Sequence, residues 1–273
     1  MASIELTILG CGSSTGVPRL GGADGKGDWG ACDPSNPRNR RRRCSILLRR
    51  KQETGETCIL VDTSPDLREQ LLAAGTRRLD AVLITHEHAD QLHGIDDLRT
   101  MAYVMQRRID VYSDRGAMEA IRHRFGYCFH TPEGSDYPAI LNARGIPEPF
   151  HDFTVDGPGG PIVVTTFWQK HGRVRSLGFR FGPIAYSSDV NALDEDAFAI
   201  LEGVDLWIVD ALRYTPHPTH ANVATALEWI ARIKPGRAVL TNLHMDLDYE
   251  KLKRELPPGV EPAYDGLVLQ VSV

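Results

Sequence analysis

The sequence has no long uncharged apolar run, and its first residues lack the basic and apolar regions of a secretory signal peptide. No hydrophobic stretch approaches the roughly 18 residues that a helix needs to span a bilayer. Hydrophobic residues make up 42% and charged residues 25% of the 273 residues, near the averages of globular proteins. We therefore expect a cytoplasmic protein with a buried core and no membrane partner.

Cysteine is scarce, and its spacing excludes two common uses. The five cysteines are odd in number and scattered, and no two of them form a CxxC pair. A disulfide framework normally shows an even number of closely spaced cysteines, and a closed structural zinc site normally contains CxxC pairs. We expect reduced thiols.

Net positive charge is also lacking, because the formal charge is −5 at pH 7. A protein that binds a nucleic-acid polymer needs several cationic contacts with phosphates, so nucleic acid is possible as a partner but not favoured. The local exception is Arg38–Arg43, in which five of six residues are arginine. This run is either a solvated loop or a phosphate contact, since one guanidinium group can donate two hydrogen bonds to the oxygens of a phosphate.

Polar side chains that can bind metals follow several predicted strands. Strands are predicted at 79–84, 162–169, 184–187, 206–209 and 238–240 from short apolar runs. The residues that follow them include histidines and aspartates, namely His86, His88, Asp90, His171, Asp189 and His244. In α/β sheets the loops after the strands converge on one edge, so these side chains are expected to lie together. Residues 126–160, rich in proline, are predicted to be an insertion with little regular structure.

The most specific stretch is Thr85-His86-Glu87-His88-Ala89-Asp90. Two histidines at i and i+2 after a strand can point to the same side and bind one cation, and Asp90 can add a carboxylate nearby. Imidazole with carboxylate is a ligand set for zinc, manganese or iron. A surface loop with incidental histidines is the alternative, and the histidines and aspartate at the other strand ends argue against it.

This stretch resembles the HxHxD signature of the metallo-β-lactamase fold hydrolases. The later segments around His171, Ser187-Ser188-Asp189 and Leu240–His244 are similar to the remaining ligand motifs of that family. The resemblance covers nearly the whole chain. It implies an α/β fold, an αββα sandwich, formed as one domain over residues 1–273. Leu9–Pro18 and Tyr264-Asp265-Gly266 are most similar to the subgroup that contains the cyclic-phosphate phosphodiesterase of carbon–phosphorus lyase operons.

The resemblance also implies a centre with two divalent metal ions, zinc or manganese. Carried over by position, His86, His88 and His171 correspond to ligands of one metal, Asp90 to a ligand of the other, and Asp189 to the carboxylate that bridges both. The family signature continues with a histidine where this chain has Gln91, and a second family histidine is replaced by Asn242.

A histidine follows each replaced position two residues later, at His93 and at His244. One hypothesis is that these two histidines bind the second metal from their new positions. The alternative is a weakened second site, because neutral amides are poorer ligands for a transition metal than imidazole.

His220 matches the position at which the subgroup has a histidine that protonates the leaving group. Its unperturbed pKa, roughly 6.5, suits this task, and His217 is the competing candidate. We predict His220 and Asp90 as the catalytic residues. Asp62 and Asp210, which directly follow strands, are predicted to orient ligand histidines or to cap turns.

These observations predict an enzyme, a metal-dependent hydrolase that cleaves small cyclic phosphates or nucleotides as a phosphoric diester hydrolase. An RNA or DNA endonuclease of the same fold is one alternative. A thioester or lactone hydrolase is another, because the same activated water attacks carbonyl groups. A non-catalytic binding protein is the third. A homodimer is the default expectation for the oligomeric state.

Overall fold

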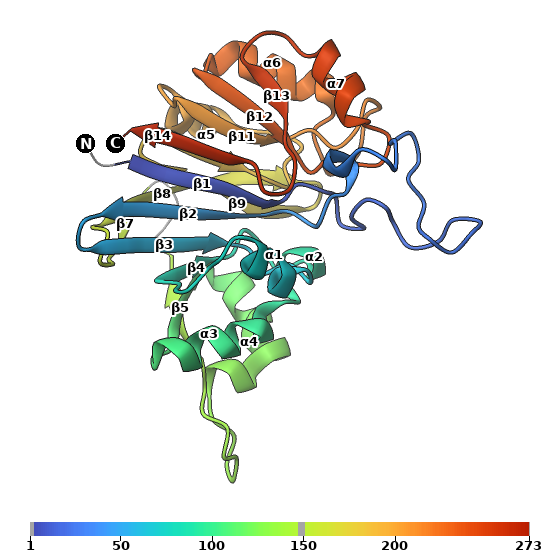
Figure 1. The fold of residues 1–273 in the computed structure, drawn as a ribbon. Helices are drawn as coiled ribbons and strands as arrows, with labels where there is room; N and C mark the ends of the chain where they lie inside the picture. The colour runs from blue at the N-terminus through green and yellow to red at the C-terminus, as the bar shows by residue number, and fades with distance from the viewer. Residues whose placement is uncertain (1–2, 147–150, 273) are drawn as a thin grey trace.

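Two seven-stranded sheets lie face to face in the computed structural model, which describes residues 3–146 and 151–272 (Figure 1). In spatial order the first sheet contains β14 (Val268–Ser272), β1 (Ser3–Gly10), β2 (Ser45–Gln52), β3 (Gly55–Val61), β4 (Ala81–Leu83), β5 (Ile109–Ser113) and β6 (Leu141–Gly145). The second contains β13 (Val260–Pro262), β12 (Arg237–Thr241), β11 (Leu206–Asp210), β10 (Ile184–Ser187), β9 (Val174–Phe181), β8 (Ile162–His171) and β7 (Asp152–Val155).

Helices cover the outer face of each sheet (Figure 1). Beside the first sheet lie α1 (Leu67–Ala73), α2 (Ala89–Leu92), α3 (Leu98–Met105) and α4 (Arg115–Phe129). Beside the second lie α5 (Glu195–Leu201), α6 (Val223–Ile233) and α7 (Tyr249–Glu255). Two 3₁₀ helices, η1 (Pro37–Asn39) and η2 (Ile95–Asp97), complete the helical elements of the described residues. The layers are helices, sheet, sheet and helices, which confirms the predicted αββα sandwich.

Alternating apolar residues produce this layering. Along β1, Ile4, Leu6 and Ile8 point to the interface between the sheets, where they belong to one buried cluster with Phe179 of β9 and Tyr186 of β10. A second buried cluster lies between the first sheet and its helices, and a third lies between the second sheet and its helices. Burial of one such side chain contributes roughly 1.5–3 kcal/mol. Among the described residues, no helix is both long enough and apolar enough to cross a membrane.

The prediction of little regular structure at 126–160 is only partly right for the described part of that range. Helix α4 continues to Phe129, and the range contains two strands, β6 and β7. Residues 147–150 lie outside the described residues. Both strands are at the edge of a sheet, β6 next to β5 and β7 next to β8. Proline is tolerated beside edge strands because only one side of the strand must pair, so the proline content misled the prediction.

Candidate metal centre

Three strands are each followed by an aspartate or asparagine with a left-handed backbone. Asp62 follows β3 with φ 64°, Asp189 follows the last residues of β10 with φ 55°, and Asn242 follows β12 with φ 62°. Asp and Asn are the residues other than glycine that adopt this conformation most readily. Left-handed residues other than glycine cluster at functional sites, where their strain is tolerated. These residues mark the sheet edge where the candidate site lies.

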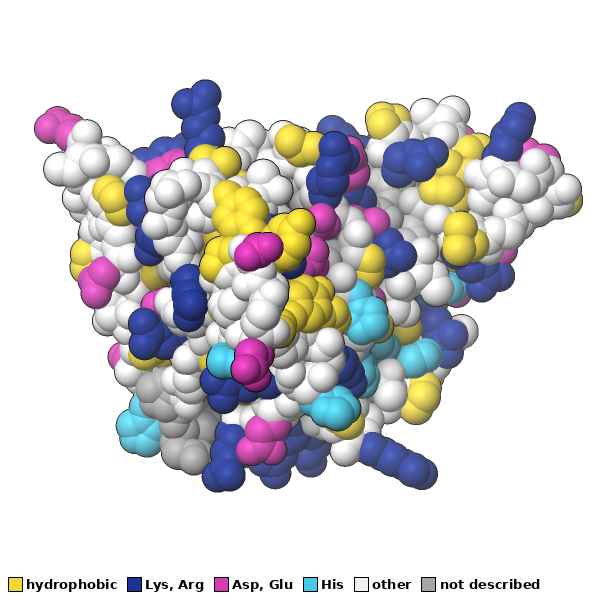
Figure 2. All heavy atoms as spheres, turned by 90° about the horizontal axis from the view of Figure 1, so that it is seen from below, with side chains coloured by type: hydrophobic (Ala, Val, Ile, Leu, Met, Phe, Trp, Pro, Cys, Tyr) yellow, Lys and Arg dark blue, Asp and Glu magenta, His cyan; other side chains and the backbone are white. Residues whose placement is uncertain are grey.

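Three histidines from two different segments come together at this edge. The ring of His86 lies 4.4 Å from that of His88 and 5.1 Å from that of His171, measured between ring centroids. The three offer ligand nitrogens that lie within 4.8 Å of one another. His171 also belongs to a second such group with Asp189 and His220. Figure 2 shows histidine side chains gathered on the lower face of the molecule. The structure therefore brings together four predicted metal ligands.

Hydrogen bonds fix the ring nitrogen that each buried histidine offers. His171 Nδ1 lies 2.7 Å from the Thr219 carbonyl oxygen, which can only accept, so Nδ1 carries the proton and Nε2 keeps its lone pair. The Thr85 hydroxyl donates to Asp62 and lies 3.0 Å from His86 Nδ1. His86 Nδ1 is therefore the donor in this pair, and its Nε2 is also free to bind a cation.

Nε2 of His86, which has no hydrogen-bond partner among the described residues, is suited to bind a cation. His86 is 1% exposed, and its Nε2 has no hydrogen-bond partner among the described residues. Burial lowers the pKa of His86 to about 3 and also lowers the pKa of His171, so both rings are neutral near pH 7. A buried neutral imidazole with an unused lone pair is a suitable ligand for zinc or manganese. His86, His88 and His171 would hold such an ion.

Two carboxylates lie beside these histidines. His171 Nε2 is 3.9 Å from Asp189 Oδ1, and Asp189 is 2% exposed. Burial opposes the ionised form of Asp189, but His86, His220 and His171 hold its pKa below the ordinary value. Burial and the charge of Asp189 raise the pKa of Asp90 to about 6. A bound cation would stabilise both carboxylates in the ionised form.

His220 lies at the other end of this group. Its Nδ1 is 2.7 Å from Asp210 Oδ2, and its Nε2 is 4.0 Å from Asp189 Oδ1. Burial lowers the pKa of His220, but the charge and hydrogen bond of Asp210, with Asp189, offset this and raise it to about 9. His217 lies beside His220, with 5.2 Å between ring centroids, and burial lowers its pKa. His220 is thus the histidine of this pair that retains a proton.

Three predicted ligands, Asp90, His93 and His244, do not join these groups. His93 is exposed and packs its ring against Phe125, with 5.6 Å between centroids. His244 Nδ1 lies 3.1 Å from Asp246 Oδ2. Neither residue belongs to the groups of ligand atoms that the described residues form. His93 and His244 have these contacts instead, so we do not retain them as ligands.

Two residues that support the site, Thr85 and Thr219, are not identified by the sequence motifs. Thr85 connects Asp62 to His86, and the Thr219 carbonyl orients His171. Thr85 directly precedes His86 at the strand end, so its position could have indicated its role. No local pattern indicates Thr219, because a backbone carbonyl is present at every residue.

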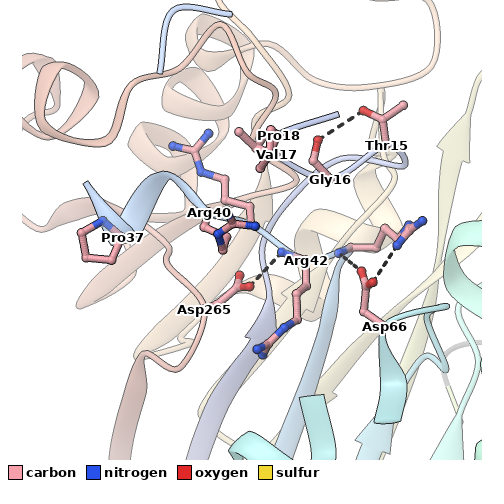
Figure 3. Close-up of a pocket in the computed structure, with 11 residues that line it drawn as sticks. Thr15, Gly16, Val17, Pro18, Pro37, Arg40, Arg42, Asp66 and Asp265 are labelled. Atoms are coloured by element: carbon pink, nitrogen blue, oxygen red, sulfur yellow. Dashed lines mark hydrogen bonds and ion pairs between the residues drawn. The ribbon is translucent and has the colours of Figure 1, made fainter. Parts of the chain in front are cut away.

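The arginine run is used mainly within the protein. Arg38 stacks on the rings of Tyr249 and Tyr264, and Arg43 forms an ion pair of 2.7 Å with Asp66. A cavity of ≈ 480 Å³ lies beside the run, lined on one side by arginines and on the other by residues of the loop after β1. Figure 3 shows Arg40 and Arg42 around this cavity. A role in phosphate binding stays a prediction.

Arg41 is the buried member of the run. It is 2% exposed, and its guanidinium donates to the carbonyl oxygens of His244 and Leu247 at 3.0 and 2.6 Å. It also donates to Asn39 Oδ1 at 3.2 Å. Arg41 thereby fastens the loop before β2 to the segment that follows β12.

Arg41→Ala should lower the free energy of unfolding by about 3 kcal/mol, because buried carbonyls lose a charged donor. Urea unfolding followed by circular dichroism measures this change. Arg40→Ala is the matched control, since Arg40 is exposed and stacks on Trp29, and it should change stability by less than about 0.5 kcal/mol. Equal midpoints for the two variants would contradict the structural role of Arg41.

Comparisons with known proteins agree with this fold. The family model described as a β-lactamase superfamily domain matches residues 57–245. A solved structure described as a new diphosphatase from the PhnP family aligns with a TM-score of 0.86 and 30% identity, over 99% of this chain and 98% of that chain. Zn²⁺-bound PqqB from Methylobacterium extorquens aligns with a TM-score of 0.73 and 20% identity, over 97% of this chain and 99% of that chain.

A curated relative has a different kind of name. An octanoyltransferase of Porphyromonas gingivalis is 34% identical over 266 residues, which are 95% of this chain. The chain spans only about half, 50%, of the length of that protein.

Proposed function

Because this chain belongs to the β-lactamase superfamily, whose fold it shares with metal-dependent hydrolases, we propose that it is a phosphodiesterase of small cyclic phosphates or nucleotides. The observation that carries the proposal is the convergence of His86, His88 and His171 with Asp189, next to a histidine that retains its proton. The likeness to a protein described as a diphosphatase, at 30% identity over nearly its whole length, supports phosphate chemistry.

Each residue has a distinct task in this proposal. His86, His88 and His171 would hold a divalent cation, zinc or manganese, with Asp189 beside them. When bound, such a cation polarises a phosphoryl oxygen and lowers the pKa of water. Asp62 through Thr85, and the Thr219 carbonyl, keep Nε2 of His86 and His171 free of protons and aimed at the site.

His220 and Asp90 are the proposed catalytic residues. Hydrolysis adds water to phosphorus and breaks one ester P–O bond, and the departing oxygen then needs a proton. His220 Nε2 would supply it, since Asp210 holds Nδ1 and stabilises the protonated ring. Asp90 would accept a proton from the attacking water, because its pKa of about 6 lies close to neutral pH.

Two alternative functions differ from this one in measurable ways. Cleavage of a diphosphate bond is suggested by the printed name of the similar structure. Octanoyl transfer is suggested only by a relative twice as long as this chain. Transfer through a cysteine thioester would need an accessible thiol, but all five cysteines are free and buried.

A cytoplasmic location and a homodimer also stay predictions.

A substrate panel tests the proposal. We expect hydrolysis of bis(p-nitrophenyl) phosphate and of a cyclic nucleotide in the presence of manganese or zinc, and its loss after treatment with a chelator. Hydrolysis of dinucleoside diphosphates but not of diesters would favour the diphosphatase, and hydrolysis of an octanoyl thioester alone would favour acyl chemistry. Affinity for RNA that falls steeply with salt would favour a polymer nuclease. No turnover by the folded protein with either metal would overturn the enzyme proposal.

A further inference from the structure

The position next to Asp90 is occupied by a buried amide. Gln91 lies in α2 directly after Asp90 and is fully buried. Its Nε2 lies 3.1 Å from Asp189 Oδ2 and 3.3 Å from Asp90 Oδ2. The side-chain nitrogen of Gln91 thus donates to both carboxylates that could otherwise share a cation.

The orientation of this amide is set by charge. Turning the amide by 180° would place Oε1 against two carboxylate oxygens, and the two N–H bonds would be lost. In the observed orientation Oε1 of Gln91 has no hydrogen-bond partner among the described residues. This costs less free energy than the turned orientation, in which both N–H bonds would be lost. An amide nitrogen has two hydrogens to donate and no lone pair for a metal. The group that faces Asp90 and Asp189 is therefore a donor that takes the place of a ligand.

A second buried amide, that of Asn242, lies beside His220 and Asp210. Asn242 is 1% exposed, and its Nδ2 lies 3.1 Å from His220 Nδ1 and 3.4 Å from Asp210 Oδ2. His93 and His244 could have served as metal ligands in place of these two amides. Both histidines have their own contacts outside the site. Each of these two amides thus contacts a charged or titratable group of the site, Gln91 at Asp90 and Asp189 and Asn242 at His220 and Asp210.

The two carboxylates need a positively polarised partner. Buried carboxylates close together repel each other unless a cation or N–H donors lie between them. On the side of His86, His88 and His171 the structure offers lone pairs, which require a cation. On the side of Gln91 it already offers N–H groups. A cation placed there would displace these hydrogen bonds and gain at most a weak amide oxygen ligand.

We propose that this chain binds one divalent cation per molecule, at His86, His88 and His171, and that the Gln91 amide replaces a second cation between Asp90 and Asp189. The inference rests on the proposed metal centre. It makes Gln91 a positioning residue, which holds Asp189 and Asp90 in place through hydrogen bonds and needs no second ion for this.

Metal content tests the inference without reference to activity. The apoprotein is titrated with Zn²⁺ and with Mn²⁺ by calorimetry, and the metal retained after gel filtration is measured by mass spectrometry. We expect about one ion per chain. The electron paramagnetic resonance spectrum of the Mn²⁺ form should be that of an isolated ion, without coupling to a second one.

The double variant Gln91→His/Asn242→His is the gain-of-site test. It replaces both amides by imidazoles and should raise the content to about two ions per chain. His93→Ala and His244→Ala are the matched controls and should retain about one. If the double variant does not fold, the wild-type titration and spectrum still decide.

The outcomes separate the two proposals. Two tightly bound ions in the wild-type protein, or coupled Mn²⁺ ions, would overturn the role of Gln91 while leaving the metal centre intact. Loss of an ion in His93→Ala or His244→Ala would overturn it as well and would restore these histidines as ligands. A folded protein that binds no ion at all would overturn the metal centre and, with it, this inference.

Discussion

His171→Ala is expected to weaken cation binding by more than about 100-fold and to reduce kcat/KM for phosphodiesters at least as much. A change in a residue that only supports a metal ligand costs about 10–100-fold in affinity or activity, and His171 is itself one of three converging imidazoles. Among the residues that the structure describes, it alone occurs in both groups of ligand atoms. Its removal therefore leaves the cation with two histidines and disturbs the surroundings of Asp189.

Metal titration of His171→Ala and steady-state hydrolysis of bis(p-nitrophenyl) phosphate measure the two losses. The matched control is His123→Ala, because His123 is an exposed histidine on α4, and it should behave as the wild type does. Circular dichroism separates loss of the ligand from loss of the fold. If folded His171→Ala kept both its metal and its activity, the assignment of the metal centre would be wrong.

His220→Ala should reduce kcat by about 100-fold or more for substrates with alcohol leaving groups and only slightly for p-nitrophenyl esters. General acid catalysis contributes roughly 10²–10⁴-fold where the departing oxygen needs a proton, and p-nitrophenolate leaves without one. Metal content should stay at the wild-type level. The comparison of two leaving groups is the readout, because a residue with a merely structural role would slow both substrates equally.

Loss of metal in His220→Ala would instead make His220 a ligand, as its place in the second group of ligand atoms allows. Asp210→Asn gives an independent check of the same role. The charge of Asp210 raises the pKa of His220, and the acid works only while it is protonated. Activity should therefore decline at lower pH in Asp210→Asn than in the wild type, and an unchanged pH profile would contradict the pairing.

Local sequence patterns decided how much of the fold and of the site could be predicted. The apolar strands at 79–84 and 206–209 are short and buried, so periodicity and composition were sufficient to locate them. His86 and His88 come after β4 and His171 ends β8, so their convergence follows from the meeting of strand ends at one edge. The edge strands β6 and β7 were missed, since their pairing with one neighbour tolerates prolines beside them.

The sequence by itself determined the αββα sandwich, through its resemblance to a known family, and the residues from which a metal centre can be built. It could not decide whether His93 or Gln91, and whether His244 or Asn242, faces the place of a second metal ion. That choice depends on the direction of each side chain at the start of α2 and after β12, which only the tertiary structure fixes. Gln91 is buried against two carboxylates, whereas His93 is exposed beside Phe125. A shift of two residues along a helix rotates a side chain by about 200°, and this rotation removes His93 from the site.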